Sequence, residues 1–277
     1  ICEIVKYPRY NIKAYAEANN RANADGDALE DYIKDVFAGV VDGGNSIERD
    51  EMLSKCFSYL GNQNNPPDMM IRGGDAIEVK KITKITSGLA LNSSYPKAKL
   101  FSDDSRINKA CRECEEWSDR DMIYAVGVAV KGNLKSLMFV YGMDYCADKE
   151  VYERVYRAVK SGVKSIKDVE LVKTKELGKV KRIDPYGITD LRMRGMWHIE
   201  NPFKLFSNYY ELQSADFNFV AIINSDKFAT FDNADRLLQL AENVENLTIR
   251  DIKIKNPNNL AELREAKLIT YAYTESH

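Results

Sequence analysis

Histidine is nearly absent from this chain of 277 residues, which contains only His198 and His277. Ser-His-Asp triads and histidine-rich metal sites therefore lack the residues they need, and both histidines are most simply surface or packing residues. Any hydrolytic chemistry must then use carboxylates, lysine, tyrosine or water bound to a metal ion.

Cysteine and long apolar runs are also scarce. Five cysteines in a chain of this length do not make a disulfide framework, which favours a reduced protein in the cytoplasm. Cys111 and Cys114 have C-x-x-C spacing without a second pair, so two buried helix cysteines are a better interpretation than zinc or redox chemistry. No apolar run is long enough to span a membrane and no signal peptide is visible, so we expect no membrane partner.

The remaining composition is that of an ordinary globular protein, with 44% hydrophobic and 30% charged residues. The chain begins at Ile1 rather than Met, so we expect the native start to be missing. The net charge of −2 hides an uneven distribution: acids outnumber bases nine to two over residues 25–51, and bases outnumber acids nine to three over residues 157–182. Such a basic segment suits docking on a phosphate backbone, although a solvated helix face is the commoner explanation of a charge run.

The stretch most informative about chemistry runs from Asn65 to Lys81, with the sequence NPPDMMIRGGDAIEVKK. It predicts a strand, a tight Gly-Gly turn and a second strand, with Asp68 just before the first strand. Glu78 and Lys80 are two residues apart on the second strand, so both side chains point to one face of the sheet. Two carboxylates and an ammonium would thus meet at the end of a hairpin, at a high electrostatic cost unless a divalent cation lies between the acids.

This group of side chains suits metal-assisted hydrolysis of a phosphodiester. Asp68 and Glu78 would supply oxygen ligands for Mg²⁺, with the backbone carbonyl of Val79 as a third protein ligand. Lys80 would contact the attacking water or the scissile phosphate. The spacing has the form of the PD-(D/E)xK nuclease motif, which is weakly specific by itself, and a solvent-facing hairpin with an incidental ion pair is the alternative.

The order of the elements around the hairpin favours the catalytic interpretation. Apolar periodicity predicts, in order, a helix over 25–39, a strand over 54–60, the hairpin, a helix capped by Asp103 or Asp104, strands over 122–130 and 134–141, and a helix over 148–163. Later elements are a strand over 217–223, a helix over 234–243 and a strand over 268–273. This order predicts an α/β fold with a central mixed β-sheet flanked by helices, and the acidic hairpin lies in its middle, ahead of a crossover helix. It is the core order of the PD-(D/E)xK nucleases.

Glu30 on the first predicted helix is a further candidate. It lies on the polar side of a helix whose apolar face includes Leu29, Tyr32 and Ile33. From there it could face the sheet edge and bind a metal ion directly or through water. A surface acid favoured by the positive end of the helix dipole is an equally good interpretation.

Two later segments carry candidate contacts to nucleic acid. The first is a polar loop whose donors suit phosphates or base edges, although they also suit ordinary loop chemistry. Its candidate residues are Asn92, Ser93, Ser94, Lys97 and Lys99. In the second segment, Arg192 and Arg194 would share a face of an extended chain, close to Trp197. Arginine is the usual bidentate reader of guanine, and pairing with phosphates or carboxylates is the alternative.

Eight segments, in order, resemble the NgoPII-type family of Type II restriction endonucleases, which cut within GGCC. They include NRANADGDALEDYIKD at residues 20–35, GDAIEVKK at residues 74–81 and RMRGMWHIENP at residues 192–202. The others lie at residues 57–68, 89–100, 140–148, 174–185 and 251–259. The resemblance covers most of the chain, and it is weak only over the first 19 residues and over residues 203–214.

The resemblance implies a PD-(D/E)xK restriction-endonuclease-like fold and Mg²⁺-dependent cleavage of double-stranded DNA that leaves 5′-phosphates. It places Asp68, Glu78 and Lys80 on the nuclease motif and Glu30 on the first-helix acid common in this class. A palindromic site also implies a two-fold symmetric homodimer. A cognate DNA methyltransferase is expected in the same system, but not as a stable partner.

We therefore expect a single restriction-endonuclease domain over residues 1–277. Its catalytic core would span about residues 20–145, with DNA-recognition and dimerisation elements mostly in 85–100 and 150–277. Two alternatives remain open: a structure-selective repair or recombination nuclease, and a non-catalytic DNA-binding protein on the same fold. The intact acid–acid–lysine set argues against the second, because buried charges without a metal ion are costly to keep.

Overall fold

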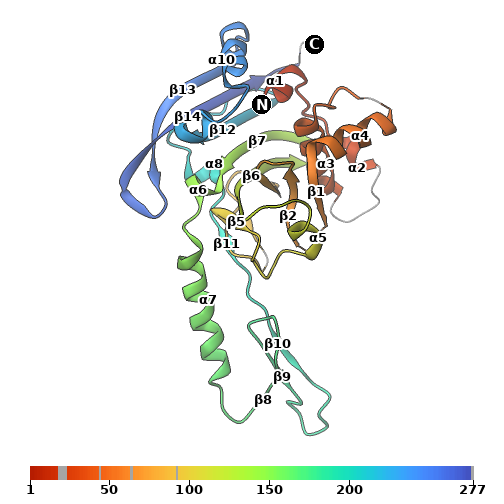
Figure 1. Cartoon of the computed structure of the whole chain (residues 1–277), viewed down its shortest axis with the longest axis vertical. Coiled ribbons are helices and arrows are strands. Elements are labelled where there is room, and N and C mark those ends of the chain that lie inside the picture. Colours follow the sequence, from red (N-terminus) through yellow and green to blue (C-terminus); the bar gives the residue numbers. More distant parts are fainter. Residues whose placement is uncertain (18–23, 44, 63–64, 92, 276–277) are drawn as a thin grey trace.

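A nine-stranded mixed sheet forms the centre of the computed structural model, which describes residues 1–17, 24–43, 45–62, 65–91 and 93–275 (Figure 1). The strand order is β1-β2-β3-β6-β7-β12-β14-β13, and β5 pairs with β6 beside this path. The strands are β1 (Phe57–Asn62), β2 (Asn65–Ile71), β3 (Ala76–Ile82), β5 (Lys99–Phe101), β6 (Asp119–Val130), β7 (Asn133–Tyr141), β12 (Phe217–Asn224), β13 (Leu247–Asn256) and β14 (Asn259–Tyr273). β3 runs parallel to β6 and β7 runs parallel to β12, whereas the other neighbours are antiparallel. The predicted α/β fold with a large mixed sheet flanked by helices is confirmed.

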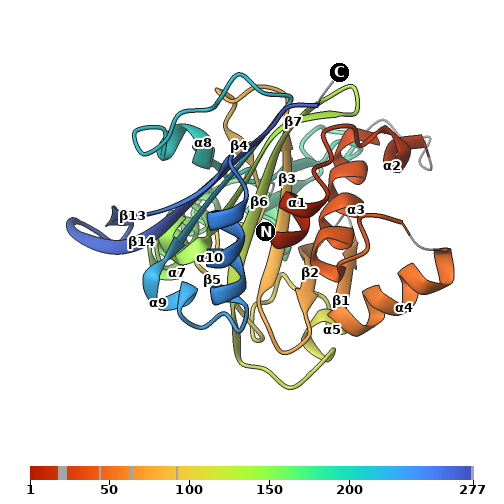
Figure 2. The same cartoon turned by 90° about the horizontal axis from the view of Figure 1, so that it is seen from above.

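Helices cover one face of this sheet. Figure 2 shows α1 (Cys2–Lys6), α3 (Ala24–Ala38) and α10 (Ala234–Asn243) on that face. Leu29, Tyr32 and Ile33 of α3 are fully buried in the cluster that these helices form with the strands. Leu29 and Ile33 each contribute about 1.5 to 3 kcal/mol by leaving water. The predicted helices over 25–39 and 234–243 are thus confirmed.

Shorter segments cover the opposite face. The helical pieces there include α6 (Gly142–Tyr145) and α8 (Pro202–Leu205), and a two-stranded sheet joins β4 (Leu89–Ala90) to β11 (His198–Ile199). Phe203 of α8 is 1% exposed and packs in the core cluster with residues of β6, β7 and β12. Other helices of the body are α2 (Lys13–Glu17), α4 (Ser46–Cys56), α5 (Lys109–Arg112) and α9 (Ser225–Phe228). Within the described part of the chain, no helix is both long and apolar enough to cross a membrane.

A two-part arm extends away from the central sheet (Figure 1). It consists of α7 (Lys149–Lys164) and a small sheet of β8 (Glu170–Leu171), β9 (Gly178–Lys181) and β10 (Leu191–Met193). The predicted helix over 148–163 is confirmed, but α7 has no fully buried residue. Val151, Val155 and Val159 on its apolar side are 45–47% exposed. The amphipathic pattern therefore does not pack this helix into the core.

Two of the predicted elements have other bounds in the structure. The strand predicted over 54–60 begins only at Phe57, because Ser54 to Cys56 complete α4, whose capping box joins Asn45 to Glu48. The helix predicted from Asp103 or Asp104 is only the four-residue α5. It is capped by Asn108, whose side-chain oxygen accepts the amide of Cys111 at 2.7 Å.

The reason for the second error lies in the carboxylate of Asp104. It accepts hydrogen bonds from the ammonium of Lys97 and the backbone amide of Arg106, so it does not cap a helix. The connection from β3 to β6 therefore consists of β4, β5, α5 and loops instead of a crossover helix. Of the cysteine pair, Cys111 is buried in α5, whereas Cys114 lies beyond it and is only partly buried.

Candidate active site

Neighbouring strands bring Asp68, Glu78 and Lys80 together. β2 and β3 pair as an antiparallel hairpin, with Met69 opposite Ile77. The Asp68 carboxylate accepts the backbone amide of Val79 at 2.6 Å, and Lys80 Nζ donates to Glu78 Oε1 at 2.6 Å. Asp68 lies within β2, so its predicted position just before the strand is wrong. The predicted clustering of these three side chains at the hairpin is nevertheless what the structure has.

The alternation of side chains along β3 explains this arrangement. Ile77 is fully buried and Val79 is 8% exposed, and both belong to the helix-covered core. Glu78 and Lys80 point to the other face, because successive strand residues alternate. Apolar packing of Ile77 and Val79 thus fixes the register that presents the charged pair to a cleft.

The charges in this group are unbalanced. Burial, and then the negative charge of Glu78, raise the pKa of the Asp68 carboxyl above its ordinary value. Burial alone would lower the pKa of Lys80, but attraction by Glu78 and Asp68 outweighs it and raises that pKa. Lys80 is consequently a firmly protonated ammonium, suited to holding an anion or a water molecule but not to removing a proton.

One oxygen of this group lacks a partner. Glu78 Oε2 is buried and makes no hydrogen bond with any residue that the structure describes. Together with Asp68 and the carbonyl of Val79, it forms a set of hard oxygen donors of the kind that Mg²⁺ prefers. Among the described residues, no group of three or more His, Cys, Asp or Glu side chains is placed to hold a metal ion. A cation here would complete its shell with backbone, water and substrate oxygens.

Asp68, Glu78 and Lys80 form part of the lining of a cleft of about 750 Å³. Four of the predicted nucleic-acid contacts line the same cleft: Ser93, Ser94, Arg194 and Trp197. The arm supplies the opposite wall, with Tyr156 and Lys160 from α7 and residues 174–177 ahead of β9. The candidate catalytic group and much of the candidate recognition surface therefore face one space.

Comparisons with known proteins agree with this arrangement. Residues 1–255 match the model of the NgoPII restriction endonuclease family. The chain is also 52% identical over 273 residues to the Type II restriction enzyme NgoPII of Neisseria gonorrhoeae, an alignment that covers 98% of this chain and 97% of that protein. The chain belongs to the NgoPII restriction endonuclease family. It is thus a Type II restriction enzyme, a hydrolase that cleaves DNA at specific sequences, as the sequence predicted. No solved structure matches the chain, so the PD-(D/E)xK assignment stays a prediction.

Glu30 of this restriction endonuclease lies near the catalytic group without joining it. Its carboxylate pairs with Lys34 of the same helix at 2.9 Å. Its negative charge nevertheless contributes to raising the pKa values of both Asp68 and Lys80.

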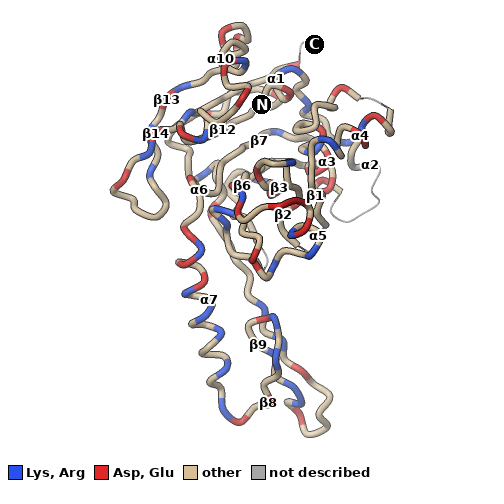
Figure 3. The backbone as a smooth tube through the Cα atoms, in the orientation of Figure 1, with Lys and Arg blue, Asp and Glu red and all other residues tan. Residues whose placement is uncertain are grey.

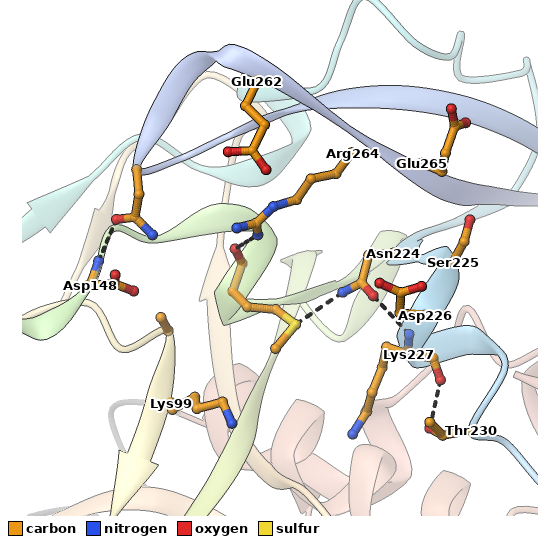
Figure 4. Close-up of a pocket in the computed structure, with 13 residues that line it drawn as sticks. Lys99, Asp148, Asn224, Ser225, Asp226, Lys227, Thr230, Glu262, Arg264 and Glu265 are labelled. Carbon is orange, nitrogen blue, oxygen red and sulfur yellow. Dashed lines mark hydrogen bonds between the residues drawn. The ribbon is translucent and has the colours of Figure 1, made fainter.

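The remaining predicted contacts lie elsewhere. Lys97 is 4% exposed and bonded to Asp104, which leaves it poorly placed to meet a phosphate. Lys99 pairs with Asp119 at 2.9 Å and lines a separate cavity of about 740 Å³. In Figure 4 that cavity also contains Lys227 and Arg264. Asn92 lies outside the described residues.

Arg192 is connected to the cleft through Glu176. Glu176 Oε1 accepts from Arg192 Nη2 at 2.6 Å and from Arg194 Nε at 2.7 Å, and Glu176 Oε2 accepts from Arg192 Nε at 3.1 Å. Hydrogen bonds from Arg192 and Arg194 lower the pKa of the Glu176 carboxyl. Glu176 thus holds the two arginines as a pair. The sequence predicted that Arg192 and Arg194 would share a face, and it gave pairing with a carboxylate as the alternative to guanine reading; the structure has both the shared position and the carboxylate pairing.

Sequence reasoning missed several residues of the cleft, namely Asn65, Arg106, Tyr156, Lys160 and Glu176. Lys160 and Glu176 lie in the basic segment 157–182, so the charge run did signal the region without identifying the residues. Arg106 lies in the connection between β5 and α5, within the helix that apolar periodicity predicted there, and no motif marks it as a cleft residue.

Proposed function

We propose that this enzyme hydrolyses double-stranded DNA with Mg²⁺ held by Asp68 and Glu78, and that the backbone carbonyl of Val79 completes the protein ligands. The supporting observation is the buried, unpartnered Glu78 oxygen beside Asp68, in a cleft that also contains a protonated lysine. When bound, the ion would supply positive charge to the scissile phosphate and activate a water molecule.

The protein's own residues would orient the reacting groups. The amide of Val79 fixes the Asp68 carboxylate, and Glu78 Oε1 fixes the ammonium of Lys80. Lys80 would hold the attacking water or a phosphate oxygen and offset the charge that develops during the reaction. Glu30 would tune the acidity of the site from α3, as its effect on the two pKa values suggests.

The arm would provide most of the DNA recognition. Figure 3 shows lysine and arginine along α7 and around β9, which suits contact with a phosphate backbone. Four residues of the cleft lining would contact DNA directly, namely Ser93, Ser94, Arg194 and Trp197. Arg192 would contact DNA beside Arg194, because Glu176 binds both arginines. Recognition of GGCC rests on the family resemblance, together with the preference of arginine for guanine. Lys97 and Lys99 are weaker candidates, given where the structure places them, whereas Asn92 stays a candidate from the sequence alone.

A palindromic site requires one active centre for each strand, so we propose that the enzyme is a homodimer. From the family resemblance we also propose that cleavage leaves 5′-phosphates. The exposed valines of α7 lie within the range 150–277, where the sequence predicts dimerisation elements. We further propose that residues 1–277 form one domain, working in the cytoplasm beside a methyltransferase that protects the same DNA sequence.

Incubation of plasmid DNA with the protein and MgCl₂ tests this proposal. The wild-type enzyme should give discrete fragments whose sequenced ends fall within GGCC, and Glu78→Ala or Lys80→Ala should abolish them. Glu113→Gln, at a residue 61% exposed in the side chain, is the control. Cleavage of branched substrates alone would favour the repair nuclease. Binding that is indifferent to Mg²⁺, without hydrolysis, would favour a non-catalytic protein.

A further inference from the structure

We propose that Arg106 is a phosphate-binding residue that holds the DNA backbone beside the catalytic group, an inference that rests on the proposed DNA cleavage in this cleft. Arg106 lies in the connection between β5 and α5. It lines the cleft together with Asp68, Glu78 and Lys80. A DNA strand whose scissile phosphate reaches those residues must pass other phosphates along the same walls.

Aromatic rings fix the guanidinium of Arg106. Its central carbon lies 4.3 Å from the ring centroid of Tyr95 and 5.5 Å from that of Tyr156. Tyr95 belongs to the body and Tyr156 to α7, so the cation lies where the arm meets the body. Attraction to ring faces orients the guanidinium without using hydrogen-bond acceptors, so its donors stay available for a ligand.

Within the described part of the chain, the Arg106 guanidinium makes no ion pair and donates no hydrogen bond that would compete with a ligand. The neighbouring carboxylate of Asp104 is already occupied. One of its oxygens accepts from Lys97, and the other accepts the backbone amide of Arg106 at 2.9 Å. The arginine pair of the arm is different, because both members are bound to Glu176. A partly buried guanidinium that forms no ion pair with a described residue is well suited to a phosphate, which arginine binds with two parallel hydrogen bonds.

A backbone contact links Arg106 to the catalytic strand. The side-chain amide of Asn65 donates to the carbonyl oxygen of Arg106 at 3.1 Å. Asn65 is the first residue of β2 and precedes Asp68 by three positions. The loop that carries the guanidinium is thereby tied to the strand that carries a metal-binding carboxylate. A phosphate bound at Arg106 would fix the distance between the DNA backbone and Asp68.

Equilibrium binding of DNA duplexes as a function of salt concentration tests this inference. The background variant is Glu78→Gln, which prevents cleavage, and the duplexes are one with and one without the cognate site. Arg106→Ala should weaken binding to both duplexes about 10-fold to 100-fold, since a charge-assisted contact is lost. It should also reduce the magnitude of the slope of log affinity against log salt concentration by about the contribution of one phosphate contact.

Two further variants keep the result interpretable. Arg106→Lys retains the charge, so it should keep the salt slope and recover part of the affinity, even if Arg106→Ala folds poorly. Lys109→Ala removes one charge three residues away, from a side chain that is 82% exposed and outside the cleft lining, and should change neither quantity. In protein that retains Glu78 and therefore cleaves DNA, Arg106→Ala should raise the KM for DNA more than it lowers kcat.

Unchanged affinity and slope in Arg106→Ala would overturn the inference. So would a loss confined to the duplex with the cognate site, which indicates base reading. A failure of the proposed function is distinguishable, because it would appear as absence of DNA cleavage by the wild-type enzyme in the plasmid assay.

Discussion

Mg²⁺ should stabilise this protein against unfolding, and the effect should depend on Glu78. One Glu78 oxygen is buried without a partner, and burial and the Glu78 charge raise the pKa of Asp68. The folded protein therefore contains two acids that lack sufficient positive charge around them. An ion bound between them replaces this repulsion with attraction, and unfolding abolishes the binding site.

The size of the effect follows from linkage. A ligand that binds only the folded state at 100 times its Kd contributes about 2.7 kcal/mol. For proteins near this length, each kcal/mol raises Tm by about 2 to 4 °C, so saturating Mg²⁺ should raise Tm by roughly 5 to 10 °C. Glu78→Gln removes one of the two carboxylate ligands while keeping the shape of the side chain, and should abolish most of that rise.

Thermal unfolding of protein freed of metal by EDTA, and then titrated with MgCl₂, measures this effect. Glu113→Gln is the matched control, since this acid is exposed and pairs with Lys109 away from the cleft. It should respond to Mg²⁺ as the wild-type protein does. An equal rise of Tm in Glu78→Gln and in the wild-type protein would refute the reasoning, because the ion would then bind elsewhere.

Three further predictions concern the arm, the hairpin and the core. Glu176→Gln should loosen the paired arginines and lower the ratio of cleavage rates between the cognate site and sites with one changed base pair, whereas Glu170→Gln, outside the cleft, should leave the ratio unchanged. Gly61→Ala would place a methyl group 2.8 Å from the carbonyl oxygen of Asp68, so both Tm and the cleavage rate should fall. Burial raises the pKa of Asp144, so its contribution to stability is present below its unfolded pKa and is lost as pH rises through the folded value. The Tm advantage of the wild-type protein over Asp144→Asn should therefore decline from about pH 4 upward, which thermal scans at a series of pH values would measure.

The hairpin that carries the candidate catalytic group could be predicted from sequence because its information is local. Alternation of Ile77 and Val79 with Glu78 and Lys80 specifies two faces, and the glycine turn specifies the reversal. The hairpin therefore brings Asp68 to its partners without help from distant segments. The helices over 24–38 and 234–243 followed from apolar periodicity for the same reason.

The opposite wall of the cleft could not be predicted, because tertiary structure assembles it. Tyr156, Glu176 and Arg194 reach the catalytic group only through the position of the arm. The apolar side of α7 shows the same limit: periodicity reports that a helix is amphipathic, but it does not identify what covers the apolar side. The short α5 shows a related limit of sequence reasoning. Asp104, one of the two acids predicted to cap this helix, instead accepts a hydrogen bond from Lys97 of another segment.

Under the proposed function, the cleft would separate chemistry from recognition and yet couple the two mechanically. The candidate metal ligands lie on adjacent strands of a rigid sheet, whereas the arm meets the body through aromatic rings. Trp197 lies edge-on to Tyr95 at 6.3 Å and to Tyr152 of α7 at 5.7 Å, and the two tyrosines stack at 5.6 Å. If the arm binds DNA as proposed, this contact would set the distance between the bound DNA and Asp68, and with it the position of the phosphates at the candidate catalytic group. Under the proposed function, base reading would control cleavage through geometry alone, and substitutions in the arm would alter the sequence that is read while the hairpin keeps its chemistry.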